Sequence, residues 1–176
     1  MQYLFSKIHL LFFACLINHN IGRHGGDSMN YRLGTRADIP VMAQIRKQQL
    51  IDEGISPDIS IDEELLRYFD AKLSDGSLVE WLVEDEGEVV ATAAILFLDF
   101  PPTYTNRSGI RGYITNMYTA PSYRGKGVAT SMLEKLIDEA RSRSVNKIFL
   151  SASTLGKPVY KKFGFIEKDQ WMELDL

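Results

Sequence analysis

Cysteine is almost absent from this sequence: Cys15 is the only one among its 176 residues. A single thiol excludes an internal disulfide, so the fold must be stabilised by its apolar core, and a reducing compartment is indicated. The three histidines form no cluster with cysteine at metal-ligand spacing. We therefore expect a functional site without a metal ion.

A long apolar run of the kind that spans a membrane is also missing. The run from Ile8 to Ile17 has about ten residues, whereas a helix needs about 20 to cross a bilayer. It has the length of a signal-peptide core, but no clear small-residue cleavage site follows it. We interpret residues 1–28 as an N-terminal extension outside the fold and residues 29–176 as the functional domain. A true signal or membrane anchor is the alternative.

Neither sign of charge dominates the chain. The net charge is −3, which argues against a general nucleic-acid binder, and 45% apolar residues suit one globular domain. The charges are nevertheless uneven, with 13 acidic and 2 basic residues from Asp52 to Glu88, and 12 basic and 4 acidic residues from Arg107 to Lys168. Solvated surfaces would explain this pattern. The functional alternative is a basic side for an anionic ligand and an acidic side for a cationic one.

Between Ile114 and Leu136 the pattern changes from a strand to a helix across a glycine-rich loop. The strand ends near Thr119, because Pro121 has no backbone N–H for pairing. Apolar residues then recur at helical spacing, which predicts an amphipathic helix that starts near Gly125. The glycines of the loop let a ligand approach the backbone closely, because they have no side chain. The backbone N–H groups at the start of a helix have no partner within the helix and attract phosphate.

Two common phosphate-binding patterns, the Walker loop and the Rossmann fingerprint, do not occur in this loop. The pattern present is Arg/Gln-x-x-Gly-x-Gly/Ala, filled by Arg124, Gly127 and Ala129. It resembles the acetyl-CoA loop of the GNAT superfamily of N-acetyltransferases. A second segment, Gly156 to Phe165, resembles the helix of that family that carries an active-site tyrosine, here Tyr160, and ends in Gly-Phe.

The rest of the domain supplies strands and helices in the order that this resemblance implies. Expected strands cover about 31–35, 78–84, 89–98, 110–119, 147–151 and 165–174, and expected helices cover about 38–54, 60–75, 125–141 and 156–163. The fold class is α+β: a mixed, mostly antiparallel sheet, flanked by about four helices and splayed at its central strands.

The resemblance also implies how acetyl-CoA would bind as a cosubstrate. The backbone of the strand before the loop would bond the pantetheine arm, the loop amides would hold the pyrophosphate, and a hydroxyl after the next strand would add a contact. The alternative for the loop is a tight turn that serves only helix packing. The residues that match the family are Met117, Tyr118, Thr119, Arg124, Gly125, Lys126, Gly127, Val128, Ala129, Thr130 and Ser153.

Direct attack of an amine on a thioester needs a neutral amine, donors for the oxyanion and an acid for the leaving thiolate. By its place in the motif Tyr160 is the expected acid, although a tyrosine on a helix can also simply pack. Many relatives carry a carboxylate on the strand before the loop, but no Asp or Glu occurs between residues 100 and 133. The remaining candidates for the base are Glu80 and Glu84. Asn116 and Glu80 are candidates for contacting the acceptor or a water beside it.

These observations predict an enzyme that transfers an acetyl group from acetyl-CoA to a primary amine of a small molecule or peptide. The alternative is a CoA-binding sensor or regulatory module without turnover, which the missing strand carboxylate favours and Tyr160 opposes. Because acetyl-CoA is an intracellular donor, we expect a cytoplasmic protein. We expect no nucleic-acid partner and no membrane span, and a homodimer is left open. The acceptor cannot be named from the sequence, since substrate loops vary on a shared scaffold.

Overall fold

A computed structural model describes residues 29–168, 172 and 174 of the chain. The expected extension at residues 1–28 therefore lies outside the described residues. The elements are β1 (Asn30–Leu33), η1 (Arg36–Asp38), α2 (Ile39–Asp52), α3 (Asp62–Ser74), β2 (Leu78–Asp85), β3 (Glu88–Asp99), β4 (Ile110–Thr119), η2 (Pro121–Tyr123), α4 (Val128–Ser142), β5 (Ile148–Leu150) and α5 (Lys157–Phe163).

The strands form one sheet in the order β1-β2-β3-β4-β5, which is also their order along the chain. The first four strands pair antiparallel, and β4 pairs with β5 in parallel. The parallel step requires a crossover, and α4 provides it. The sheet is therefore mixed and mostly antiparallel, as predicted.

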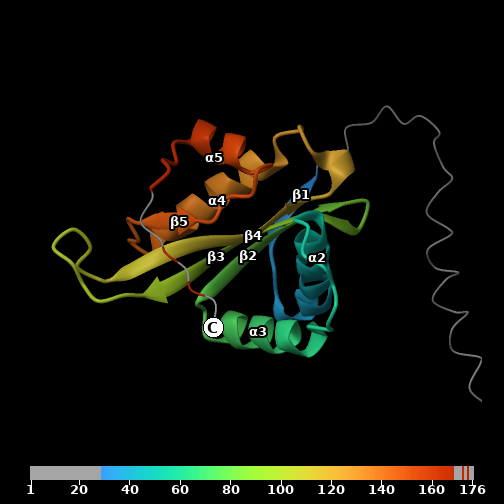
Figure 1. Cartoon of the computed structure of the whole chain (residues 1–176), viewed down its shortest axis with the longest axis horizontal. Coiled ribbons are helices and arrows are strands. Elements are labelled where there is room, and N and C mark those ends of the chain that lie inside the picture. Colours follow the sequence, from blue (N-terminus) through green and yellow to red (C-terminus); the bar gives the residue numbers. More distant parts are fainter. Residues whose placement is uncertain (1–28, 169–171, 173, 175–176) are drawn as a thin grey trace, which may run out of the picture.

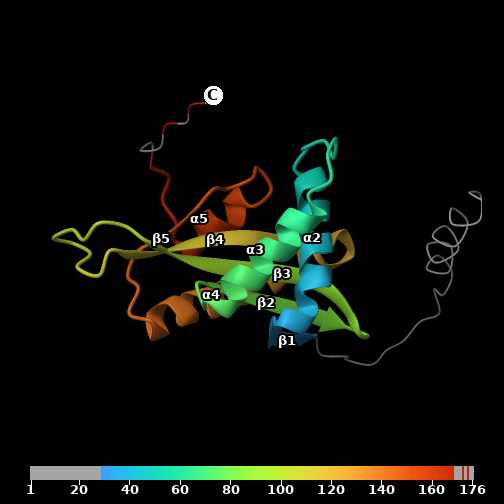
Figure 2. The same ribbon diagram turned by 90° about the horizontal axis from the view of Figure 1, so that it is seen from below.

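Helices cover both faces of this sheet. In Figure 1, α4 and α5 lie above the sheet, and α2 and α3 lie below it; Figure 2 shows α2 and α3 in front of the strands. Each face has its own apolar core. The core under α4 includes Met132, Leu133 and Leu136, which are fully buried, and the core under α2 and α3 is centred on Met42 and Phe69.

Strands β4 and β5 stay paired only over a short stretch. Gly112, Tyr113 and Ile114 pair with the three residues of β5, and within the described chain β4 has no strand neighbour on that side beyond Ile114. The second half of β4, up to Thr119, therefore has an open backbone edge. The sheet is thus open between β4 and the chain that follows β5, which agrees with the predicted splaying of the sheet.

The sheet is also irregular at the centre of β4. Thr92 of β3 pairs with Tyr118 and Ala94 pairs with Thr115, so Ala93 lies opposite two residues of β4. One of these two is Asn116, whose φ of 51° is unusual for a residue other than glycine. The arrangement is a β-bulge, and such bulges redirect side chains next to functional sites.

The predicted element order is confirmed, with two differences. Helix α4 begins at Val128 and not near Gly125, because Gly125 and Gly127 adopt positive φ values of 77° and 83° that a helix does not accommodate. The expected closing strand at 165–174 is not observed at residues 165–168, 172 and 174, which are irregular, and its other residues lie outside the described chain. In the described ranges, every helix is too short or too polar to cross a membrane.

Candidate active site

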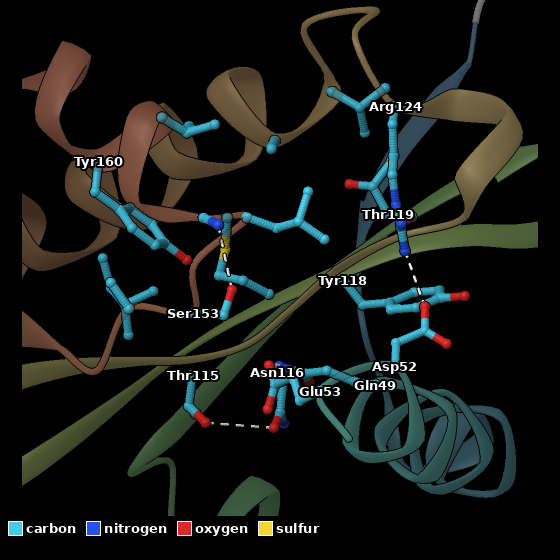
Figure 3. A pocket seen from close by; sticks show the side chains of 18 of the residues that line it. Gln49, Asp52, Glu53, Thr115, Asn116, Tyr118, Thr119, Arg124, Ser153 and Tyr160 are labelled. Carbon is cyan, nitrogen blue, oxygen red and sulfur yellow. Dashed lines mark hydrogen bonds and ion pairs between the residues drawn. The ribbon is translucent and has the colours of Figure 1, made fainter. Parts of the chain in front are cut away.

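An open cleft of about 1120 Å³ lies where β4 and β5 diverge. Its walls come from the end of α2, the second half of β4, the loop before α4, and the segment from Ser151 into α5. Figure 3 shows Tyr160 and Ser153 on one side of this cleft and the end of α2 on the other. Segments far apart in the sequence, including both predicted motifs, therefore share one site.

The glycine-rich loop presents backbone amides to the cleft. Gly127 caps α4 in the left-handed region, and Ser131 is the residue whose N–H bonds the Gly127 carbonyl, at 3.0 Å. The amides of Val128, Ala129 and Thr130 therefore precede the first helical hydrogen bond of α4. All three residues line the cleft, and nothing lies within 4 Å of where a Cβ of Gly127 would stand. The loop thus has the space and the positive helix end that an anion requires.

The cations of the loop have protein partners in this structure. The Arg124 guanidinium donates to Asp52 on α2 at 2.9 Å and to the Thr119 carbonyl at 2.9 Å, which bridges the cleft from loop to helix (Figure 3). Hydrogen bonds from Gln48 and from Arg124 lower the pKa of Asp52. Lys126 is not among the residues that line the cleft, and its ammonium lies 4.9 Å from the ring centre of Tyr123. A pyrophosphate contact of either cation stays a prediction.

The predicted pantetheine strand has the required open edge. Met117, Tyr118 and Thr119 all line the cleft, and on the other side Tyr118 and Thr119 pair with β3. An extended ligand can add to such an edge as an extra strand does.

Tyr160 lies on α5 with its ring packed into the core and its hydroxyl at the cleft. It is 8% exposed, and its ring meets Phe165 edge-on at 5.9 Å. Gly156 is needed beside it, since a Cβ there would approach the ring to 2.8 Å. Burial raises the pKa of Tyr160 to about 12, with smaller contributions from Glu53 and Tyr113. Tyr160 therefore stays protonated at neutral pH, as a proton donor must.

Ser153, the predicted hydroxyl contact, lies in the turn that leads into α5. Its hydroxyl accepts a hydrogen bond from the Gly156 amide at 3.2 Å, and its carbonyl accepts from the Lys157 amide at 3.0 Å. Ser153 also lines the cleft. A local structural role thus exists for this residue, and its contact with acetyl-CoA stays a prediction.

The bulge in β4 turns Asn116 toward a buried carboxyl group. The Asn116 side-chain amide donates to Glu80 of β2 at 3.1 Å, and its backbone carbonyl accepts from the Thr92 hydroxyl at 2.9 Å. Asn116 lines the cleft, whereas Glu80 is 1% exposed and lies behind it. Any role of Glu80 in the reaction would therefore act through Asn116. Glu84, the other candidate base, is paired with Arg32 at 2.6 Å.

Burial raises the pKa of Glu80 to about 8 from 4.5, although the Asn116 hydrogen bond and the Arg46 charge oppose the shift. At a pH between these two pKa values, the Glu80 carboxyl holds a proton in the folded protein and releases it in the unfolded chain. The contribution of Glu80 to the free energy of unfolding therefore falls as the pH rises. Glu80→Gln stays neutral at every pH. We therefore expect its free energy of unfolding, relative to that of the wild type, to be higher at pH 9 than at pH 5 by at least about 1 kcal/mol. Urea denaturation at both pH values measures this gain.

Glu84→Gln is the matched control for that prediction. The Arg32 hydrogen bond lowers the pKa of Glu84. The free energy of unfolding of this variant, relative to the wild type, should therefore not increase between pH 5 and pH 9. Equal stability differences for Glu80→Gln at pH 5 and pH 9 would mean that the Glu80 carboxyl titrates alike in the folded and unfolded chains.

Sequence reasoning missed a row of polar side chains on α2. Arg46 donates to the Gln49 side-chain oxygen at 3.1 Å, and the Gln49 amide donates to Glu53 at 3.0 Å. All three residues line the cleft, and Gln49 is 8% exposed. A polar residue at a buried helix position was the available signal, but the apolar stripe of α2 is the stronger pattern in this segment.

Comparisons with known proteins agree with this geometry. A sequence model described as the acetyltransferase (GNAT) family matches residues 44–165. A predicted acetyltransferase from Clostridium acetobutylicum, solved with acetyl-CoA, is 57% identical; the match covers 84% of this chain and 96% of that chain, with a TM-score of 0.83.

Glucosamine 6-phosphate N-acetyltransferases are also similar to the chain. The protein from Trypanosoma brucei brucei is 31% identical over 90 residues, which are 51% of this chain and 59% of the relative. The protein from Arabidopsis thaliana is 28% identical over 110 residues, which are 61% of this chain and 72% of the relative. The chain thus spans less than two thirds of the length of the Trypanosoma relative. The family match covers well over half of the chain and includes both motifs, and the chain belongs to the acetyltransferase (GNAT) family.

Proposed function

We propose that this protein transfers the acetyl group of acetyl-CoA to the primary amine of a small molecule by direct attack of the amine on the thioester. The observation that carries this proposal is the meeting of a glycine-rich loop at a helix start, an open strand edge and the Tyr160 hydroxyl in one cleft. Family membership and the acetyl-CoA in the Clostridium structure support it.

The described residues fit acetyl-CoA in three respects. The amides from Val128 to Thr130 suit the pyrophosphate, and the β4 edge up to Thr119 suits the pantetheine arm. The cleft of about 1120 Å³ is large enough for a ligand of this size class. The thioester would then lie between the β4 bulge and Tyr160.

In the reaction, the amine nitrogen forms a bond to the carbonyl carbon, and the bond from carbon to sulfur breaks. Backbone amides near Met117 and Tyr118 would hold the oxyanion, since a bulge leaves part of the ladder unpaired. The Tyr160 hydroxyl would donate its proton to the departing thiolate and recover one from solvent. Asn116 would orient the acceptor.

The similar curated proteins suggest where to look for the acceptor. Their names give glucosamine 6-phosphate as the acetylated amine, and an amino sugar is therefore the first compound to test here. The end of the cleft beside α2 carries both signs of charge, with Arg46 and Glu53. Such a site suits an acceptor that is itself polar and charged.

A thiol-release assay with acetyl-CoA tests the function. The panel contains amino sugars and their phosphates, polyamines, amino acids and aminoglycosides, with mass spectrometry of the acetylated product. We expect turnover of at least one amine at a rate above thioester hydrolysis. Binding of acetyl-CoA without turnover of any amine would favour the sensor or regulatory module.

Several further properties belong to this proposal. A cytoplasmic location follows from the intracellular donor, and no metal ion is invoked in the reaction.

The domain would comprise residues 29–176. A shortened chain that begins at Met29 should match the full chain in acetyl-CoA affinity and turnover, measured by calorimetry and the thiol assay. Loss of folding in the shortened chain would contradict the domain assignment.

A further inference from the structure

The proposed reaction leaves one task without a residue, the removal of a proton from the acceptor. A primary amine is mostly an ammonium ion at neutral pH, and its lone pair attacks only after a proton has left. Strand β4 carries no carboxylate. The group must therefore come from another wall of the cleft.

Among the described residues, two carboxylates line the cleft: Asp52, the last residue of α2, and Glu53, which follows it. Asp52 forms an ion pair with Arg124 at 2.9 Å. Glu53 forms no ion pair with any residue in the described part of the chain. Glu53 is thus the carboxylate of the two that can receive a cation without displacing a cationic partner.

The Glu53 side chain is oriented by its neighbours on the helix. The buried Gln49 amide donates to it at 3.0 Å, and Arg46 fixes Gln49 from the other end at 3.1 Å. The three residues are spaced by three and four positions, so they form one row along the helix. Holding a long side chain in this way reduces the entropy that ligand binding would otherwise cost.

Glu53 faces Tyr160 from the α2 side of the cleft. Its charge is the second contribution, after burial, to the raised pKa of the Tyr160 hydroxyl. Figure 3 shows Gln49 and Glu53 on the α2 side of the cleft, across from Tyr160 and Ser153. An amine placed between the β4 bulge and Tyr160 would therefore have Glu53 on its α2 side.

We propose that Glu53 binds the acceptor as an ammonium ion and takes its proton, and that the acceptors of this enzyme are therefore small primary amines that are cationic at neutral pH. This inference rests on the proposed function. In the step, one N–H bond breaks and its proton passes to the Glu53 carboxylate. The freed lone pair attacks the thioester carbon, the bond from carbon to sulfur breaks, and the Tyr160 proton passes to the thiolate. The nitrogen loses its second proton to solvent as the amide forms, Tyr160 recovers one from solvent, and Glu53 releases its proton to solvent. Gln49 is a positioning residue that acts through Glu53.

Glu53→Gln tests the proposal, because it keeps the size of the side chain and an oxygen that Gln49 can contact. With the best cationic amine of the panel, we expect kcat/KM at pH 7 to fall about 30-fold, as for loss of a charge-assisted hydrogen bond. The deficit should shrink to within about threefold near pH 10, where more of the amine is already neutral. The Kd of acetyl-CoA, measured by calorimetry, should not change.

Two further variants complete the experiment. Glu63→Gln removes an exposed carboxylate on α3, outside the cleft, and should behave as the wild type at every pH. Gln49→Met should lower kcat/KM at pH 7 about fivefold with the same recovery at high pH, since the Glu53 carboxylate would remain but lose its orientation. A pH-independent loss in both Glu53→Gln and Gln49→Met would indicate structural damage and overturn the proposal.

The two proposals fail in different ways. If the wild type acetylates amines but Glu53→Gln is equally active at pH 7, the Glu53 inference is wrong and the proposed function stands. The same holds if only amines that are neutral at pH 7 are acetylated. If the wild type binds acetyl-CoA and acetylates no amine in the panel, both proposals are overturned.

Discussion

Tyr160→Phe should lower kcat on the order of 100-fold and leave the affinity for acetyl-CoA unchanged. The substitution keeps the ring, its edge-on contact with Phe165 and its place in the core, but removes the hydroxyl. In the described chain no protein group hydrogen-bonds that hydroxyl, so its loss should cost little stability. Steady-state kinetics with the best acceptor, together with calorimetry for acetyl-CoA, measure the effect.

The pH profile adds a second test of Tyr160. Because burial raises the pKa of its hydroxyl to about 12, Tyr160 should remain protonated through pH 10. Its removal should therefore lower the rate at all pH values from 6 to 10 without changing the shape of the profile. Tyr31→Phe, on β1 and outside the cleft, is the matched control. Normal turnover in Tyr160→Phe would leave Tyr160 a packing residue only.

Gly127→Val should weaken acetyl-CoA binding about 100-fold, or about 2.7 kcal/mol. Two effects add up. The branched side chain would occupy the open space before the amides of α4, and the φ of 83° would strain the loop that presents them. Charge-assisted hydrogen bonds from several amides would be lost together. Calorimetry with CoA and with acetyl-CoA measures the change.

Gly87→Val provides a matched control for this loop. Gly87 has a φ of 84°, again with nothing within 4 Å of where its Cβ would stand, but it lies in the turn between β2 and β3. The backbone strain should therefore be similar while acetyl-CoA affinity stays at the wild-type value. Equal affinities for Gly127→Val and the wild type would exclude the loop as the pyrophosphate site.

The sequence predicted those parts of the molecule whose signals are local. Strand β4 was placed at Ile110–Thr119 because its β-branched and aromatic residues end at a proline. The loop and the tyrosine helix carry motifs of a few residues each, and they were assigned together with the family. Both motifs lie within the residues that the family model matches.

The parts that were missed depend on distant contacts. The bulge that turns Asn116 toward Glu80 arises from the register between β3 and β4, which no single segment contains. Pairing of Arg124 with Asp52 joins residues 72 positions apart. Glu53 follows the last turn of α2, where a charged residue usually means only a solvated end. Only the assembled cleft distinguishes Glu53 from the other acidic residues of its region.

The open edge of β4 has a consequence for how this protein can change during evolution. On our proposal the cosubstrate is held mainly by peptide groups, from the β4 edge up to Thr119 and from the loop at Val128–Thr130. Most side-chain substitutions leave the peptide groups unchanged, so many mutations on these segments should leave acetyl-CoA binding intact. Binding of the acceptor depends instead on side chains at the end of α2, such as Gln49 and Glu53. A lineage could therefore exchange one acceptor for another through a few codons of α2 and still use the same donor.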